Sequence, residues 1–99
     1  MFVHSNYLVG TSSVLVASIP KAAGPTLVTI NNRDNQDIFI GDSDITASVG
    51  INGGNQVDAG GTVQLWLSGG DTLYAISNHV TPSGAVAISY SYIPKDYPV

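Results

Sequence analysis

The sequence predicts an all-β domain, an antiparallel β-sandwich or jelly-roll-like barrel of about seven or eight short strands. Glutamate is absent and Lys and Arg together number 3, so residues that usually cover exposed helix faces are scarce. Gly, Ser, Thr, Val and Ile are abundant instead, which suits short strands joined by tight turns. Apolar runs recur about every ten residues between turn residues, and none keeps a 3.6-residue period.

Each predicted strand is a short apolar run bounded by turn residues. The clearest case is "TVQLWL", in which Val63, Leu65 and Leu67 alternate with polar or aromatic neighbours. The Asn- and Asp-rich stretch 32–36 is predicted to join two neighbouring antiparallel strands. The predicted strands are 12–19, 26–32, 37–40, 62–67, 72–77 and 84–93, with up to two very short ones between 45 and 61.

A length of 99 residues suits one domain, 1–99. The ends differ in composition from the predicted strands, and two prolines interrupt the last residues, "IPKDYPV". We therefore predict arms at about 1–8 and 94–99 that dock onto a neighbouring subunit. Tyr7, Tyr97 and Pro98 are the predicted contact residues.

Composition excludes several classes of function. The chain has no cysteine, so it forms no disulfide scaffold and no thiolate zinc site. The net charge of −4 argues against nucleic-acid binding, which needs clustered Lys and Arg. No apolar run approaches the roughly 18–20 residues of a membrane span, and the start "MFVHSNYLVG" lacks the features of a signal peptide. We expect a soluble protein without a cofactor.

The stretch "IFIGDSDIT" resembles the strand end at which GDS-type serine hydrolases present a nucleophile, here Ser43. Such an enzyme needs a histidine base that a carboxylate orients. That family supplies both from a DxxH motif, whereas Ile76 stands three residues before His79, and His4 is the only other histidine. The partners of a catalytic serine are missing, so we predict that the protein is not an enzyme.

The same stretch places Asp42, Asp44 and Thr46 at the first, third and fifth positions of a calcium-loop pattern. The expected glycine is Ala47 and the expected bidentate Glu is Gly53. Aspartates at turns also bond to the local backbone without an ion. We predict a capped turn and no metal site, and the sequence leaves ion binding by Asp42 and Asp44 open.

The aromatic side chains of the predicted strands allow two interpretations. They are core or subunit-interface residues, or they line a face that binds a sugar or peptide. The sequence favours the first interpretation and keeps the second as an alternative. These residues are Trp66, Tyr74, Tyr90 and Tyr92.

The run "VTINNRDNQDIFIGDSDITASVGINGGNQVDAGGTVQLWLSGGDTLYAIS", about half of the chain, resembles a module of small structural proteins of tailed bacteriophages. The shared pattern is "[I/V]-[F/Y]-[I/V/L]-G-D-S-x-[I/V]-T", a glycine-bearing link and "G-D-x-L-Y-A". The matching residues are Ile38, Phe39, Ile40, Gly41, Asp42, Ser43, Ile45, Thr46, Gly50, Ile51, Gly70, Asp71, Leu73, Tyr74 and Ala75.

The resemblance implies a virion component with a β-sandwich and no catalytic residues. We predict a capsid decoration protein that stabilises the shell, located in the virion and on the capsid surface rather than the tail. Its expected partners are the major capsid protein or another virion protein and copies of itself, with a trimer as the first expectation. The alternative is a head or tail fibre or adhesin module that binds a glycan through Trp66 or Tyr92.

Overall fold

The computed structural model describes residues 2–42, 54–79 and 84–91. These residues form eight strands, and no helix in the described ranges is long and apolar enough to cross a membrane. The strands are β1 (Phe2–Tyr7), β2 (Val14–Ser18), β3 (Thr26–Asn32), β4 (Ile38–Gly41), β5 (Asn55–Val57), β6 (Thr62–Leu67), β7 (Thr72–Ile76) and β8 (Val86–Ser91).

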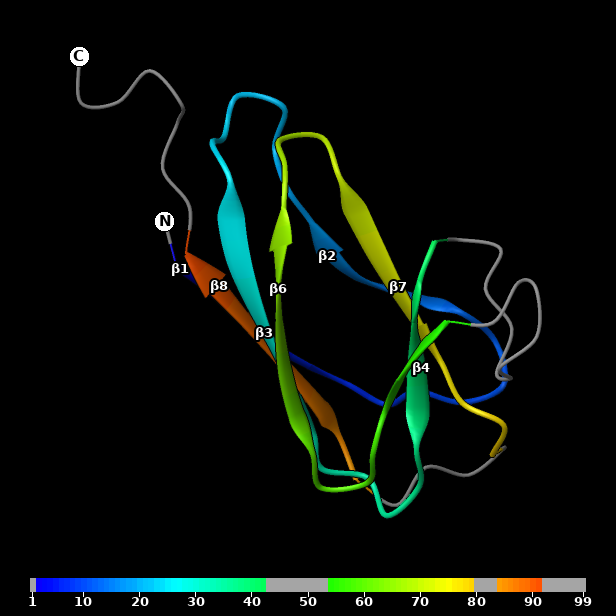
Figure 1. Cartoon of the computed structure of the whole chain (residues 1–99). Helices are drawn as coiled ribbons and strands as arrows, with labels where there is room; N and C mark the ends of the chain where they lie inside the picture. The colour runs from blue at the N-terminus through cyan, green and yellow to red at the C-terminus, as the bar shows by residue number, and fades with distance from the viewer. Residues whose placement is uncertain (1, 43–53, 80–83, 92–99) are drawn as a thin grey trace.

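The strands form two four-stranded antiparallel sheets that pack face to face (Figure 1). Sheet A has the order β1-β8-β3-β6, and sheet B has the order β2-β7-β4-β5. The strands pair as β1 with β8, β2 with β7, β3 with β6 and β4 with β5, as in one long antiparallel hairpin that is rolled up. This is the topology of an eight-stranded jelly roll. The predicted fold class is confirmed.

The core lies between the sheets, because successive side chains of a strand point to opposite faces. In β3, Val28 and Ile30 are buried, and Thr29 between them is only partly covered. In β8, Val86, Ile88 and Tyr90 are buried, and the small Ala87 between the first two is buried as well. Sheet B contributes a matching set, which is Val16, Ile38, Ile40, Val57, Leu73 and Ala75.

Most connections cross from one sheet to the other. The prediction that 32–36 joins two neighbouring strands is wrong, because β3 belongs to sheet A and β4 to sheet B. The buried Asn32 fixes this crossing. Its Nδ2 donates to the carbonyl oxygens of Gln36 at 2.9 Å, Val57 at 3.2 Å and Asp58 at 3.2 Å. One side chain thus ties the end of β3 to both the crossing loop and the end of β5.

Two turns pack against each other at the end of the sandwich where β6 meets β7. Gly70 has φ +91, and the amide of Ser68 donates to the carboxylate of Asp71 at 2.7 Å. A Cβ placed on Gly69 would lie 2.5 Å from the carbonyl oxygen of Ala23, in the turn between β2 and β3. Glycine at position 69 therefore permits this close backbone approach.

Candidate functional site: the outer face and edges of sheet A

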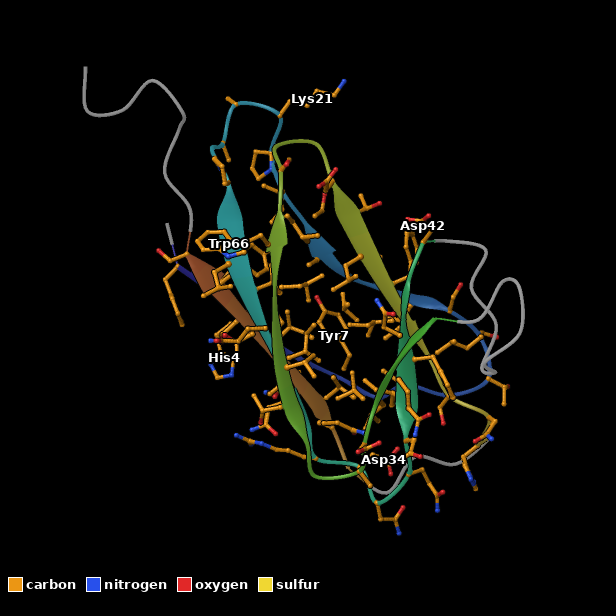
Figure 2. All side chains as sticks on the ribbon, viewed as in Figure 1. His4, Tyr7, Lys21, Asp34, Asp42 and Trp66 are labelled. Carbon is orange, nitrogen blue, oxygen red and sulfur yellow. The ribbon has the colours of Figure 1, made fainter. Side chains whose placement is uncertain are left out.

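Of the three predicted contact residues, the structure describes Tyr7. Tyr7 ends β1, pairs with Val86 and packs against the core, and Figure 2 shows it between the two sheets. Residues 2–7, predicted as part of an arm, thus form a regular strand of sheet A. Tyr97 and Pro98 lie outside the described residues.

The corner at the end of β4 is only partly described. Gly41 is the last residue of β4, and Asp42 follows it as an exposed residue, as Figure 2 shows. Ser43, Asp44 and Thr46 lie outside the described residues. Among the described side chains, no group of three His, Cys, Asp or Glu residues is placed to hold a metal ion.

The outer face of sheet A carries an apolar row at one end. Phe2 of β1 pairs with Ser91 of β8, and Leu27 of β3 pairs with Trp66 of β6. Val28, which follows Leu27, pairs with Tyr90, which precedes Ser91. The pair from β1 and β8 therefore lies beside the pair from β3 and β6 in one row across the sheet. Phe2 is 67% exposed and Trp66 is 68% exposed. Two large aromatic side chains therefore face solvent on the outer face of the sheet.

The next row on the same face is polar. Its members are His4, Ser89, Thr29 and Gln64, one from each strand. The side-chain amide of Gln64 donates to the hydroxyl of Thr29 at 3.0 Å. The His4 ring lies edge-on to Phe2, with centroids 6.4 Å apart. The face therefore combines an apolar end with polar hydrogen-bonding side chains, a composition that suits contact with another protein surface.

Within the described residues, no further strand pairs with either edge of sheet A, and we call these two edges open. β1 and β6 each have six residues and contain no Asp, Lys, Arg or Pro, and in the described part of the chain each pairs with one strand only. Natural sheets usually protect an edge with charge, proline, a bulge or a very short strand. Sheet B uses the last two devices, because β2 has a register shift between Leu15 and Ala17 and β5 has three residues. The unprotected backbone of this fold thus lies on sheet A.

Sequence reasoning missed β1. Its inward side chains are Val3, Ser5 and Tyr7, and its outward ones are Phe2, His4 and Asn6. Neither set is uniformly apolar, so the period-2 signal that reveals the other strands is weak here. The strand forms because all six of its residues pair with β8, although its own sequence pattern is weak. The open edges were also missed, because strand order cannot be read from single strands.

Comparison with known proteins gives a fold relationship. No protein-family model and no curated protein matches the chain. A solved structure from Bacillus, described as "Bacillus endospore appendages form a novel family of disulfide-linked pili", matches with a TM-score of 0.60. The sequences are 11% identical, and the match covers 95% of this chain and 85% of that chain. At this identity the likeness establishes a shared fold.

The comparison overturns the predicted function. The capsid-decoration prediction is wrong, because the structure that matches this fold belongs to a pilus family and not to a phage capsid. The alternative of a glycan-binding adhesin module gains no support either. The sequence resemblance to phage modules, the trimer, the capsid-protein partner and the virion location are not tested and stay predictions.

Proposed function

We propose that this protein is a non-enzymatic structural subunit that assembles with copies of itself into a pilus-like filament. The observation that carries the proposal is the pair of open edges of sheet A, β1 and β6. The likeness to a pilus subunit over 95% of the chain supports it, since the same fold serves an appendage in that protein. The exposed apolar row adds a surface that burial in an assembly would stabilise.

Strand direction favours an open-ended assembly. Sheet A has four strands and all its pairs are antiparallel, so β1 and β6 run in opposite directions. A second copy in the same orientation can therefore place its β1 beside β6 of the first and continue the antiparallel alternation. Such a contact joins two different surfaces, and it produces filaments when the rotation does not close a ring.

The proposal has a measurable geometry. Neighbouring strands are about 4.8 Å apart, so four strands advance the filament by about 19 Å per copy. Sheet twist of about 20–25° per strand adds roughly 80–100° of rotation per copy. We expect electron microscopy of the concentrated full-length protein to show thin helical filaments with these approximate values.

Lysine substitutions at an edge and at the centre of the same face test the proposal. Thr62→Lys with Gln64→Lys places two charges on β6, whereas Asn31→Lys with Thr29→Lys places them on the paired positions of central β3. Edge lysines oppose strand addition. We expect the β6 variant to raise the concentration needed for filaments roughly tenfold or more, and the β3 variant to change it much less.

Light scattering and electron microscopy measure the concentration at which each variant forms filaments. Thermal unfolding checks that both variants fold. Equal losses in the two variants would show that charge on the face matters and the edge does not. Absence of filaments from the unmodified protein at every concentration would contradict the proposed function itself.

A further inference from the structure

The three strand pairings of sheet A continue the same rows of residues from one edge of the sheet to the other. In the polar row, His4 pairs with Ser89, Ser89 also pairs with Thr29, and Thr29 pairs with Gln64. None of these pairings, which lie within the described residues, has a register shift. On the outer face, the rows end in three pairs of edge residues, Phe2 and Trp66, His4 and Gln64, and Asn6 and Thr62.

The backbone groups at the two edges match in the same way. In an antiparallel sheet a residue directs its N–H and C=O to one neighbouring strand, and the side alternates along the strand. Sheet A has an odd number of pairings between its edges, so the two residues that end a row direct these groups both outward or both inward. A second copy that adds with row opposite row therefore sets outward groups of β1 against outward groups of β6. We call this arrangement the level register.

A shift of one residue from the level register is excluded by the backbone and by the faces. It would set outward backbone groups against inward ones, and it would place the side chains of the outer face beside those of the core face. Shifts of two residues keep both matches. The side chains must therefore decide between the level register and a shift of two.

The aromatic side chains at the ends of the apolar row favour the level register. Phe2 and Trp66 are both exposed and lie at opposite edges of the sheet. In the level register, Phe2 of one copy lies directly opposite Trp66 of the next, and directly opposed aromatic side chains stabilise a strand pair. A shift of two residues in one direction sets Trp66 beside His4. A shift in the other direction sets Phe2 beside Gln64, so either shift ends the direct opposition of the two rings.

We propose that β1 of one copy pairs with β6 of the next in the level register, and that contact between Phe2 and Trp66 selects this register. The inference rests on the proposed function and names the residues that meet at its junction. The rows of the outer face then continue from copy to copy without a step. The remaining outer pairs, His4 with Gln64 and Asn6 with Thr62, set no two like charges against each other.

Single cysteines test the register in the full-length protein, because the chain has no cysteine of its own. Directly opposed residues have Cα atoms about 4.5–5.5 Å apart, which a disulfide can join. A residue two places further along the strand is about 8 Å away, beyond the roughly 7 Å that a disulfide spans. The variants replace exposed residues of the outer face and are His4→Cys, Asn6→Cys, Thr62→Cys and Gln64→Cys.

Equimolar mixtures of two variants are oxidised mildly under conditions in which the unmodified protein forms filaments. The level mixtures are Asn6→Cys with Thr62→Cys, and His4→Cys with Gln64→Cys. The exchanged mixtures, Asn6→Cys with Gln64→Cys and His4→Cys with Thr62→Cys, are the matched controls because they contain the same cysteines. We expect roughly fivefold or more cross-linked dimer in the level mixtures. Gel electrophoresis without reducing agent measures the dimer, and thermal unfolding checks that each variant folds.

Tryptophan fluorescence tests the aromatic contact, because Trp66 is the only tryptophan of the chain. Assembly should move its emission to shorter wavelength, since Phe2 of the next copy excludes water from the indole ring. Phe2→Ser should reduce this change and raise the concentration needed for filaments roughly threefold. Leu8→Ser is the control, because Leu8 is 67% exposed, as Phe2 is, but lies beyond the end of β1. Equal effects of the two variants, or an emission that assembly leaves unchanged, would overturn the contact.

Failure of this inference and failure of the proposed function give different results. Filaments with as much cross-linking in the exchanged mixtures, or with none in any mixture, would leave the pilus-like function standing and overturn the level register. More dimer within a single variant than in the level mixtures would mean that like edges pair, which also overturns it. Level cross-links without filaments from any protein would support the register and contradict the filament. A monomeric unmodified protein at all concentrations would contradict both.

Discussion

At the scale of single residues, the side chain of Asn32 joins several backbone segments through hydrogen bonds. It is fully buried, its Nδ2 faces three carbonyl oxygens, and its Oδ1 accepts from the amide of Asp34 at 3.0 Å. An apolar side chain of similar size would leave several of these backbone groups without their partner. A buried polar group without a partner lowers the free energy of unfolding by more than a satisfied hydrogen bond raises it.

We expect Asn32→Leu to lower the free energy of unfolding by about 2–4 kcal/mol, because it removes a buried network of hydrogen bonds. Urea unfolding followed by circular dichroism measures the change. Asn31→Leu is the control, since Asn31 is its chain neighbour on the outer face and is only partly buried. A loss below about 1 kcal/mol for Asn32→Leu would mean that the crossing loop holds without this side chain.

At the scale of elements, turns decide how closely the strand ends pack. Gly60 and Gly70 have positive φ, whereas Gly69 is needed for a different reason, the approach of the carbonyl of Ala23. Positive φ strains the backbone of any other residue, and a blocked backbone approach forces a turn to move. The two costs can be separated, because a Cβ on Gly60 meets nothing within 4 Å.

We expect Gly60→Ala to cost about 1 kcal/mol from backbone strain. Gly69→Ala should cost more, about 2 kcal/mol or above, because its Cβ meets a backbone oxygen that cannot rotate away. Thermal unfolding of both variants gives the order. A smaller loss for Gly69→Ala than for Gly60→Ala would show that the two turns separate easily.

At the scale of the whole molecule, the absence of cysteine sets this chain apart from the pili that share its fold. That family is described as disulfide-linked, whereas this chain contains no cysteine. Filaments of this chain would be held by strand pairing and apolar burial. These contacts depend on denaturant and salt and not on redox state.

We expect filaments assembled from this protein to keep their length and number in excess reducing agent, because no disulfide links the copies. Denaturant should dissolve them instead, since it weakens apolar burial. Electron microscopy before and after each treatment measures both effects. Loss of filaments under reduction alone would point to a second, cysteine-containing component.

Much of the fold was predictable because its signals are local. The bounds of β3 and β6 agree with the predicted 26–32 and 62–67, since alternating apolar residues and flanking turn residues mark each strand within its own sequence. In the structure, the alternating residues Val28, Ile30 and Leu67 lie on the buried face of their strands. The candidate site was not predictable in the same way. Residues 2–7, which end at Tyr7 and form the edge strand β1, were assigned to an arm.

The sequence by itself determined the all-β class, most strand positions and the absence of disulfides, because composition and period-2 patterning act over a few residues. Only the tertiary structure decided which strands are neighbours and which described strands form the edges of each sheet. The reason is physical, since pairing between β1 and β8 or β3 and β6 joins residues far apart in the chain. Such contacts depend on register, burial and crossing loops such as the one Asn32 fixes, and no single stretch of sequence contains them.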